Sequence, residues 1–500
     1  MKVRKKTLCR TCRRRKISCD GKQPSCSQCL NSGRSCEGYP EALFVPCQTS
    51  TGLGQLRSKT SQKGVSNLSL PPSVPLTTNN LIKRKTDLPT FSPIYPCLID
   101  PWENSIPLII HNYVPKQEII ADIIEIVPKS PRICGSWVTV LPDLAAGSSG
   151  TLGECFTSAV NALALSITSY QTGQQLVQPI SSSYEYALRL LQQNLQSLKG
   201  SYSSELVAAV MCIALLEISS PTTPNSSLVH IHGAGELIRL SSPEVFSTGI
   251  HHKLFIGIRP LLVIQALMLR KATFLADEDW IKAPFQLYEQ SQLQNLLNLA
   301  AALPGILERI DALRDESAQT ASKEAKGIIT QLVKMKMKFE LWAKSFEAES
   351  PMAHYWNQTN NNGLEDQNDT LCFSSLSTAN ALTCLWSVQI ICMSHIQDLL
   401  ARFPELAAFA IIVPITALRE TCIELSARIL RSMGFVMQDS FLLYGQFSAT
   451  FPLHTAYHAL SRDSKGRAVF DKLRKSLMPR ISFEIGSFGK RIPTNGKRNV

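Results

Sequence analysis

Apolar residues recur at helical spacing over most of the chain beyond about residue 95. One stripe, at positions i, i+3, i+4, i+7, i+11 and i+14, runs through Tyr184, Ala187, Leu188, Leu191, Leu195 and Leu198. Such a stripe covers one face of an amphipathic helix. No series of alternating strands with hairpin turns interrupts the pattern. The pattern therefore predicts a mainly α protein.

Two segments are apolar on nearly every side. Glu205 to Glu217 is one of them, and a helix without a polar face belongs inside a core. The Ser, Thr and Pro residues from Ser219 onward predict a loop after this helix. Leu254 to Leu269 is the other, but it contains Arg259 and is shorter than the roughly 20 residues that span a membrane. We expect a buried core helix there and no membrane partner.

A heptad-like series marks a further long helix. Its members are Ala318, Ala321, Ala325, Ile328, Leu332, Met335, Phe339 and Trp342. The series fits either a dimer interface or a helix packed inside the domain. Gly327 weakens it as a zipper, so internal packing is favoured and a homodimer stays open.

The chain from Glu37 to about Pro96 has a different composition. It is rich in Ser, Thr, Gly, Pro and Asn and shows no sustained apolar period. This composition predicts a flexible, disordered linker. No coiled-coil heptads follow the cysteine-rich amino terminus, so no dimerisation segment is visible there.

Six cysteines near the amino terminus form an internal repeat. Cys9, Cys12, Cys19, Cys26, Cys29 and Cys36 follow C-x2-C-x6-C twice. A C-x2-C pair brings two sulfurs to one tetrahedral metal ion, and a structural zinc takes four ligands. Two zincs therefore need only six cysteines if two of the sulfurs bridge. Three disulfides are an alternative, but the first eight residues contain no apolar signal region. A further alternative is one zinc bound by four cysteines, with two thiols unused. Of these possibilities, two zincs are favoured.

Positive charge is concentrated in the same segment. Up to Cys36 there are eleven basic residues and a single acid, Asp20. This excess of basic residues supplies most of the net charge of +12. So dense a positive charge favours binding to a polyanion over a merely solvated surface.

Cys9 to Cys36 resembles the fungal Zn2Cys6 binuclear-cluster DNA-binding domain. Every cysteine position matches, as do the basic run from Arg13 to Lys16 and Pro24. The resemblance implies two short helices around two Zn²⁺ ions, with Cys9 and Cys26 as bridging ligands. Zinc one would then take Cys9, Cys12, Cys19 and Cys26, and zinc two would take Cys26, Cys29, Cys36 and Cys9.

The same resemblance places Lys16 and Arg15 against bases, at a CGG-type triplet in the major groove. Lysine and arginine donors to guanine are also the commonest direct readout. Arg13 and Arg14 are better placed for phosphates. Arg10 and Lys22 complete the predicted DNA-binding residues. Many members carry a lysine where this chain has Ser18, which removes one expected phosphate contact.

Looser motifs resemble the α-helical regulatory domain of many such fungal regulators. They include Ser136-Trp137, Tyr184 with Ala187-Leu188, and His232-Gly-Ala. We accordingly divide the chain into a Zn2Cys6 DNA-binding domain (1–40), a linker (41–95), an all-α regulatory domain (96–480) and a basic tail (481–500). The resemblance implies a nuclear regulator of RNA polymerase II transcription whose partners are double-stranded DNA and the transcription machinery.

Two other classes of function compete with this one. A scaffold protein could use the cluster as a structural staple, but it would not need the cations at Lys16 and Arg15. A zinc enzyme needs an open coordination position, which saturated cysteine sites lack. No G-x-S-x-G, P-loop or H-E-x-x-H motif occurs, so we do not expect an enzyme. His230, His232, His251 and His252 are interpreted as core or surface residues, and the later cysteines as buried thiols.

Overall fold

The computed structural model describes a small amino-terminal module and a large helical domain. In the module it describes residues 11–12, 15, 17, 19–20, 26–34 and 36. In the domain it describes 104–118, 131, 133–197, 201–223, 225–349, 353–358, 370–406, 415–462 and 464–477. The predicted linker and basic tail lie outside these residues.

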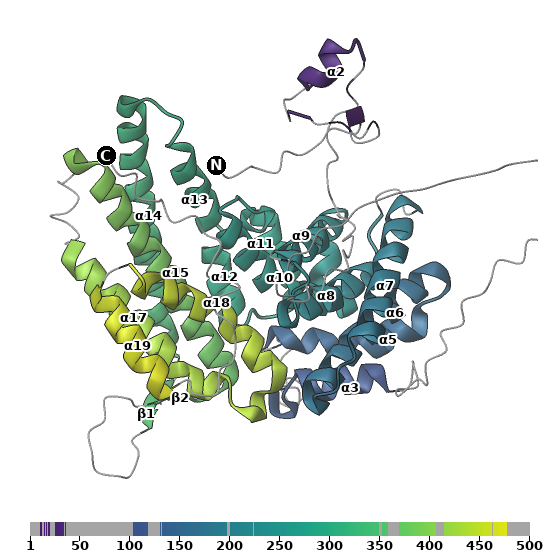
Figure 1. Ribbon diagram of the computed structural model, residues 1–500. Coiled ribbons are helices and arrows are strands. Elements are labelled where there is room, and N and C mark those ends of the chain that lie inside the picture. The colour runs from purple at the N-terminus through teal and green to yellow at the C-terminus, as the bar shows by residue number, and fades with distance from the viewer. Residues whose placement is uncertain are drawn as a thin grey trace, which may run out of the picture. The chain divides into compact units, whose positions relative to one another are not determined.

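Helices dominate the described residues, which confirms the mainly α prediction (Figure 1). The first helix, α2 (Ser27–Asn31), belongs to the amino-terminal module. The amino-terminal half of the domain contains α3 (Ser105–Tyr113), α5 (Leu141–Gly147), α6 (Gly150–Thr172), α7 (Val177–Ser197), α8 (Ser204–Ser219), α9 (Ser226–Arg239) and α10 (Gly249–Leu269). The other half contains α11 (Glu278–Lys282), α12 (Gln292–Ala300), α13 (Leu303–Ala312), α14 (Ala318–Ala348), α15 (Leu376–Arg402), α17 (Ile415–Val436), α18 (Leu442–Leu460) and α19 (Ser464–Leu477). Short 3-10 helices join them: η1 (Cys134–Val140), η2 (Pro243–Ser247), η3 (Phe274–Ala276), η4 (Ala283–Phe285), η5 (Pro404–Leu406) and η6 (Asp439–Phe441).

Helix α8 lies in the core, as its uniformly apolar sequence predicts. Every residue from Leu206 to Glu217 is buried, and α6 and α9 pack against the helix. Ser203 caps its amino end by accepting a hydrogen bond from the amide of Leu206 at 3.2 Å. At the other end, the buried carboxylate of Glu217 accepts hydrogen bonds from the amide and hydroxyl of Thr222, at 2.8 and 2.7 Å. Glu217 therefore holds the loop that the Ser, Thr and Pro residues predict.

The buried face of α7 agrees with the predicted stripe at Tyr184, Ala187 and Leu191. Leu188 and Leu195 are only half-buried, and Leu198 lies outside the described residues. The face is completed by Leu190 and by Asn194, which donates to the Thr151 and Leu190 carbonyls at 3.1 and 2.9 Å. A buried asparagine is stable here because its amide is paired within the helix pair α6–α7.

Two described helices, α10 and α15, are long and apolar enough to cross a membrane. The most apolar stretch of each is 67% and 78% buried inside the domain. Such burial fits core helices, which is the position predicted for Leu254–Leu269. Arg259 is fully buried, and it donates to the backbone and side-chain oxygens of Gln294 at 3.1 and 2.9 Å. Pro260 has no N–H for the Ile256 carbonyl, and Gln294 Nε2 donates to that carbonyl instead, at 3.3 Å.

Helix α14 carries the predicted heptad series, and most of the series faces the domain interior. Ala321, Ala325, Ile328, Leu332, Met335 and Phe339 are buried. Ala318 is exposed and Trp342 is half-buried. The helix packs on α12, α13 and α15, which agrees with internal packing of this stripe.

The C-terminal helices form a second packed group, in green and yellow in Figure 1. Helix α17 packs against α15, α18 and α19. A two-stranded antiparallel sheet, which the apolar pattern did not predict, adds to this group. It pairs β1 (Tyr355–Gln358) with β2 (Thr370–Phe373), in a register that sets Tyr355 opposite Phe373. Asn357 and Thr370, which flank a polar stretch of the sequence, both lie in these strands.

Candidate metal centre and nucleic-acid interface

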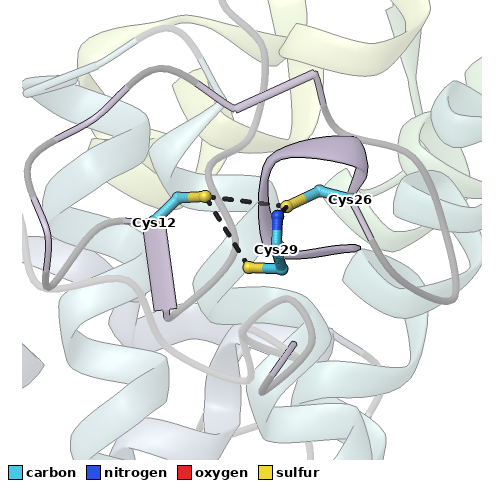
Figure 2. A group of neighbouring side chains, drawn as sticks. All are labelled: Cys12, Cys26 and Cys29. Atoms are coloured by element: carbon cyan, nitrogen blue, oxygen red, sulfur yellow. Dashed lines mark hydrogen bonds between the residues drawn. The ribbon is translucent and has the colours of Figure 1, made fainter. Parts of the chain in front are cut away.

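Three cysteine sulfurs converge in the amino-terminal module (Figure 2). Cys12 Sγ lies 3.6 Å from Cys26 Sγ and 3.9 Å from Cys29 Sγ, and all three side chains are fully buried. Disulfide sulfurs lie about 2.05 Å apart, so these cysteines are not bonded to one another. A tetrahedral zinc with Zn–S bonds of about 2.3 Å holds its sulfurs about 3.8 Å apart. The donor atoms and their spacing therefore fit zinc.

The local sequence explains how Cys26 and Cys29 share one side of the module. Cys26 is extended, with φ −72° and ψ 150°, and caps the amino end of α2. Its sulfur accepts a hydrogen bond from the Cys29 amide at 3.4 Å. One helical turn then returns the Cys29 side chain toward the cap. The C-x2-C spacing thus places both sulfurs at the amino-terminal end of α2.

Cys26 is common to two groups of candidate ligands. It groups with Cys12 and Cys29, and also with Cys19 and Asp20, with the ligand atoms of each group within 4.8 Å of one another. Asp20 Oδ1 also accepts a hydrogen bond from the Ser27 amide at 3.0 Å, so this carboxylate shapes the loop between the two halves. A sulfur shared by two groups is what a bridging ligand requires.

The remaining two predicted ligands are less fully described. Cys36 is half-buried and packs against the buried cysteines. Cys9 lies outside the described residues.

Arg15 is the one predicted DNA-binding residue that the structure describes. Arg10, Arg13, Arg14, Lys16 and Lys22 lie outside the described residues. The Arg15 amide donates to the Thr11 carbonyl at 3.2 Å, which closes a helical turn after the first C-x2-C pair. Its guanidinium donates to Ser32 Oγ at 3.3 Å. Arg15 therefore links the two halves of the repeat through one of the five N–H donors of its guanidinium.

Ser32 is a contributor that sequence reasoning missed. Its hydroxyl donates to the Gln28 carbonyl at 2.8 Å and accepts from Arg15. The one available signal was its position directly after α2, where serine commonly bonds backbone groups.

The four histidines do not form a metal site. His230 is buried, and its Nε2 lies 3.2 Å from the Tyr184 hydroxyl. His252 Nδ1 lies 3.0 Å from the Phe246 carbonyl. His232 is exposed. His251 Nδ1 lies 3.2 Å from the Tyr202 hydroxyl. Among the described residues no group of three candidate ligands includes a histidine.

The later cysteines that the structure describes form no disulfide with one another, and most are buried. Burial raises the pKa of Cys155, Cys212, Cys384 and Cys392 to about 12. These thiols are therefore protonated and unreactive at neutral pH, as the interpretation as small buried side chains predicts. Cys47 and Cys97 lie outside the described residues.

Two families match this chain. Residues 7–43 match the fungal Zn(2)-Cys(6) binuclear cluster domain, and residues 117–411 match the fungal specific transcription factor domain. No solved structure matches.

Curated relatives match over shorter segments. An uncharacterised protein of Emericella nidulans is 29% identical over 150 residues, which cover 30% of this chain and 31% of that protein. The transcriptional regulatory protein moc3 of Schizosaccharomyces pombe is 54% identical over 41 residues, or 8% of each chain. White-opaque regulator 2 of Candida albicans is 44% identical over 46 residues, covering 9% of this chain and 10% of the relative. The chain thus matches less than a third of the length of each.

The second family match spans more than half of the chain, and the first spans the cysteine repeat, whose domain type binds two zinc ions. The protein belongs to the fungal specific transcription factor family, and its amino-terminal cysteine repeat is a Zn(2)-Cys(6) binuclear cluster domain.

Proposed function

We propose that the protein is a nuclear regulator of RNA polymerase II transcription that reads a CGG-type triplet in the major groove. The observation that carries the proposal is the shared position of Cys26 between two groups of ligands, in a segment with eleven cations and one acid. The metal cluster fixes the segment, and the cations bind phosphates and bases. The domain boundaries are 1–40, 41–95, 96–480 and 481–500.

All six cysteines of the repeat act as zinc ligands in this proposal. Cys9 and Cys26 bridge, Cys12 and Cys19 complete zinc one, and Cys29 and Cys36 complete zinc two. When bound, the zinc ions supply structure and not chemistry, since four sulfurs saturate each ion and leave no position for water. The protein therefore acts by binding and not by catalysis.

The cations divide into two groups by role. Lys16 and Arg15 donate to the guanine edges, and Arg15 is held in place by its bond to Ser32. Arg10, Arg13, Arg14 and Lys22 contact phosphates, which set the register without specifying sequence. The helical domain contacts the transcription machinery and controls activity.

Selection from random duplex DNA tests this assignment. The zinc-loaded full-length protein enriches CGG-type triplets, and Lys16→Ala loses the enrichment. Losing a bidentate contact costs about 1–3 kcal/mol of discrimination. Lys338→Ala removes one positive charge from the exposed side of α14 and serves as the matched control. Paired triplets at fixed spacing would indicate a homodimer, whereas single triplets would indicate a monomer. No enrichment by the zinc-loaded protein would favour the scaffold function instead.

A further inference from the structure

The helical domain contains a partly enclosed cavity of about 100 Å³. Its walls come from η1 and α10 in the amino-terminal half and from α15 and α18 in the carboxyl-terminal half. Trp137, Leu215, Ile264 and Phe451 are among its apolar lining residues. Protein interiors seldom leave voids larger than a water molecule. An apolar cavity of about 150 Å³ admits benzene, so this smaller one limits a ligand to a single ring smaller than benzene.

One buried side-chain oxygen on the cavity wall lacks a hydrogen-bond partner among the described residues. Asn380 of α15 is 6% exposed, and its Nδ2 donates to the Tyr444 hydroxyl at 3.3 Å. Its Oδ1 has no hydrogen-bond partner among the described residues. Tyr444 is itself fixed, since its hydroxyl accepts from the Cys134 amide at 3.2 Å. Buried carbonyl oxygens are ordinarily paired, so an unpaired one beside a void indicates an absent donor.

A second acceptor arises from a proline in α18. Pro452 has no N–H, so it cannot donate to the carbonyl of Ser448 one turn earlier. Both residues line the cavity. The Ser448 hydroxyl does not replace the missing donor, because it donates to the Gly445 carbonyl at 2.9 Å. The cavity wall thus carries two acceptors, Asn380 Oδ1 and the Ser448 carbonyl.

A proline in α10 also removes a helical donor, but there another side chain replaces it. Pro260 also lines the cavity, and the carbonyl that it releases, that of Ile256, accepts from Gln294 Nε2 at 3.3 Å. A side chain of the protein supplies that donor. For Asn380 Oδ1 the described residues supply none.

We propose that this cavity is a binding site for a small, mostly apolar ring compound that carries one N–H or O–H group. The ring packs among the apolar lining, and its donor bonds Asn380 Oδ1 or the Ser448 carbonyl. The site joins the two halves of the helical domain, so it gives that domain a ligand-binding role beyond the reading of DNA.

Pyrrole and furan are matched probes for this site, because both are five-membered rings and pyrrole alone carries an N–H donor. Each is titrated into the full-length protein without DNA, and the rise in melting temperature reports affinity. Pyrrole binds about tenfold more tightly than furan, which is the factor expected from one hydrogen bond. Equal binding of the two rings, or no binding of either, would overturn the proposal.

Three variants locate the bound ring. Asn380→Leu lowers pyrrole affinity toward that of furan and leaves furan unchanged. Cys384→Leu adds volume to the cavity wall and weakens both rings. Asn161→Leu is the control, because Asn161 Oδ1 is also buried and unpaired but lies outside the cavity, and it leaves both affinities unchanged. Unchanged pyrrole binding in Cys384→Leu would contradict the site. Since no DNA is present, a negative result leaves the proposed DNA function untouched.

Discussion

Trp137 packs directly on the backbone of Gly257. A β-carbon at position 257 would lie 2.6 Å from three carbon atoms of the Trp137 side chain, which is closer than carbon atoms approach without a shift. This contact joins η1 to α10 in the core of the helical domain. Only glycine allows it at position 257, since any other residue carries a β-carbon.

Replacing this glycine is therefore expected to destabilise the protein. Gly257→Ala lowers the free energy of unfolding by about 1–3 kcal/mol, the usual cost of overpacking a core. Gly327→Ala is the matched control in α14, where a β-carbon would meet nothing within 4 Å. That change stabilises the helix by roughly 0.5–1 kcal/mol, because alanine loses less backbone entropy. Urea denaturation measures both, and a stable Gly257→Ala variant would show that the contact is not rigid.

The helical core shows which parts of this fold the sequence predicts and which it does not. The uniformly apolar run of α8 and the heptad-like stripe of α14 predict burial correctly, because helix periodicity depends on local sequence alone. The contact of Trp137 with Gly257 joins residues 120 positions apart, and no local pattern reports it. Asn194 and Arg259 are buried polar residues that each bond a partner on another helix. Their pairing depends on the tertiary arrangement.

The metal centre is predicted more fully than the cavity. Cysteine spacing determines which sulfurs share a turn, so the pairing of Cys26 with Cys29 follows from the repeat. The approach of Cys12 to Cys29 does not follow from it, since the predicted ligand sets place these two cysteines on different zincs. The bond between Arg15 and Ser32 does not follow from spacing, because it crosses between the two halves. The cavity residues come from helices far apart in the chain, and Asn380 resembles any other helical asparagine until its neighbours are known.

Zinc stoichiometry separates bridging from terminal ligands. Cys26→Ser removes a sulfur that both ions share, so the protein retains less than one zinc per chain. Cys29→Ser removes a ligand of zinc two alone, so it retains about one. Cys372→Ser, at a half-buried cysteine of β2 outside the repeat, retains two. Native mass spectrometry counts the ions, and equal losses in the first two variants would refute the shared position of Cys26.

His395 makes stability depend on pH. Burial, together with Arg270 and Arg462, lowers the pKa of His395 to about 3, while Asp311 opposes the shift. Its Nε2 lies 3.0 Å from Arg270 Nη1, and its Nδ1 lies 3.8 Å from a carboxylate oxygen of Asp398. In the unfolded chain a histidine titrates near 6.5, so the unfolded state binds the proton more tightly.

The contribution of neutral His395 to the free energy of unfolding is fully present above about pH 6.5 and declines as the pH falls toward 3. In that window the slope from one histidine is about 1.4 kcal/mol per pH unit. Chemical denaturation at several pH values measures it. His395→Gln reduces the slope, whereas His232→Gln, at an exposed position of α9, leaves it unchanged. Equal slopes in His395→Gln and the parent protein would contradict the assignment.

The central claim is that a zinc cluster holds the basic segment in a shape that reads DNA sequence. The direct measurement is the affinity of the full-length protein for a duplex containing a CGG triplet and for one with that triplet scrambled, before and after zinc removal. The zinc-loaded protein is expected to prefer the CGG duplex by roughly tenfold or more, given about 1–3 kcal/mol per base contact. Zinc removal abolishes the preference and leaves only salt-sensitive binding to both duplexes. Equal affinities for the two duplexes with both zincs bound would contradict the claim.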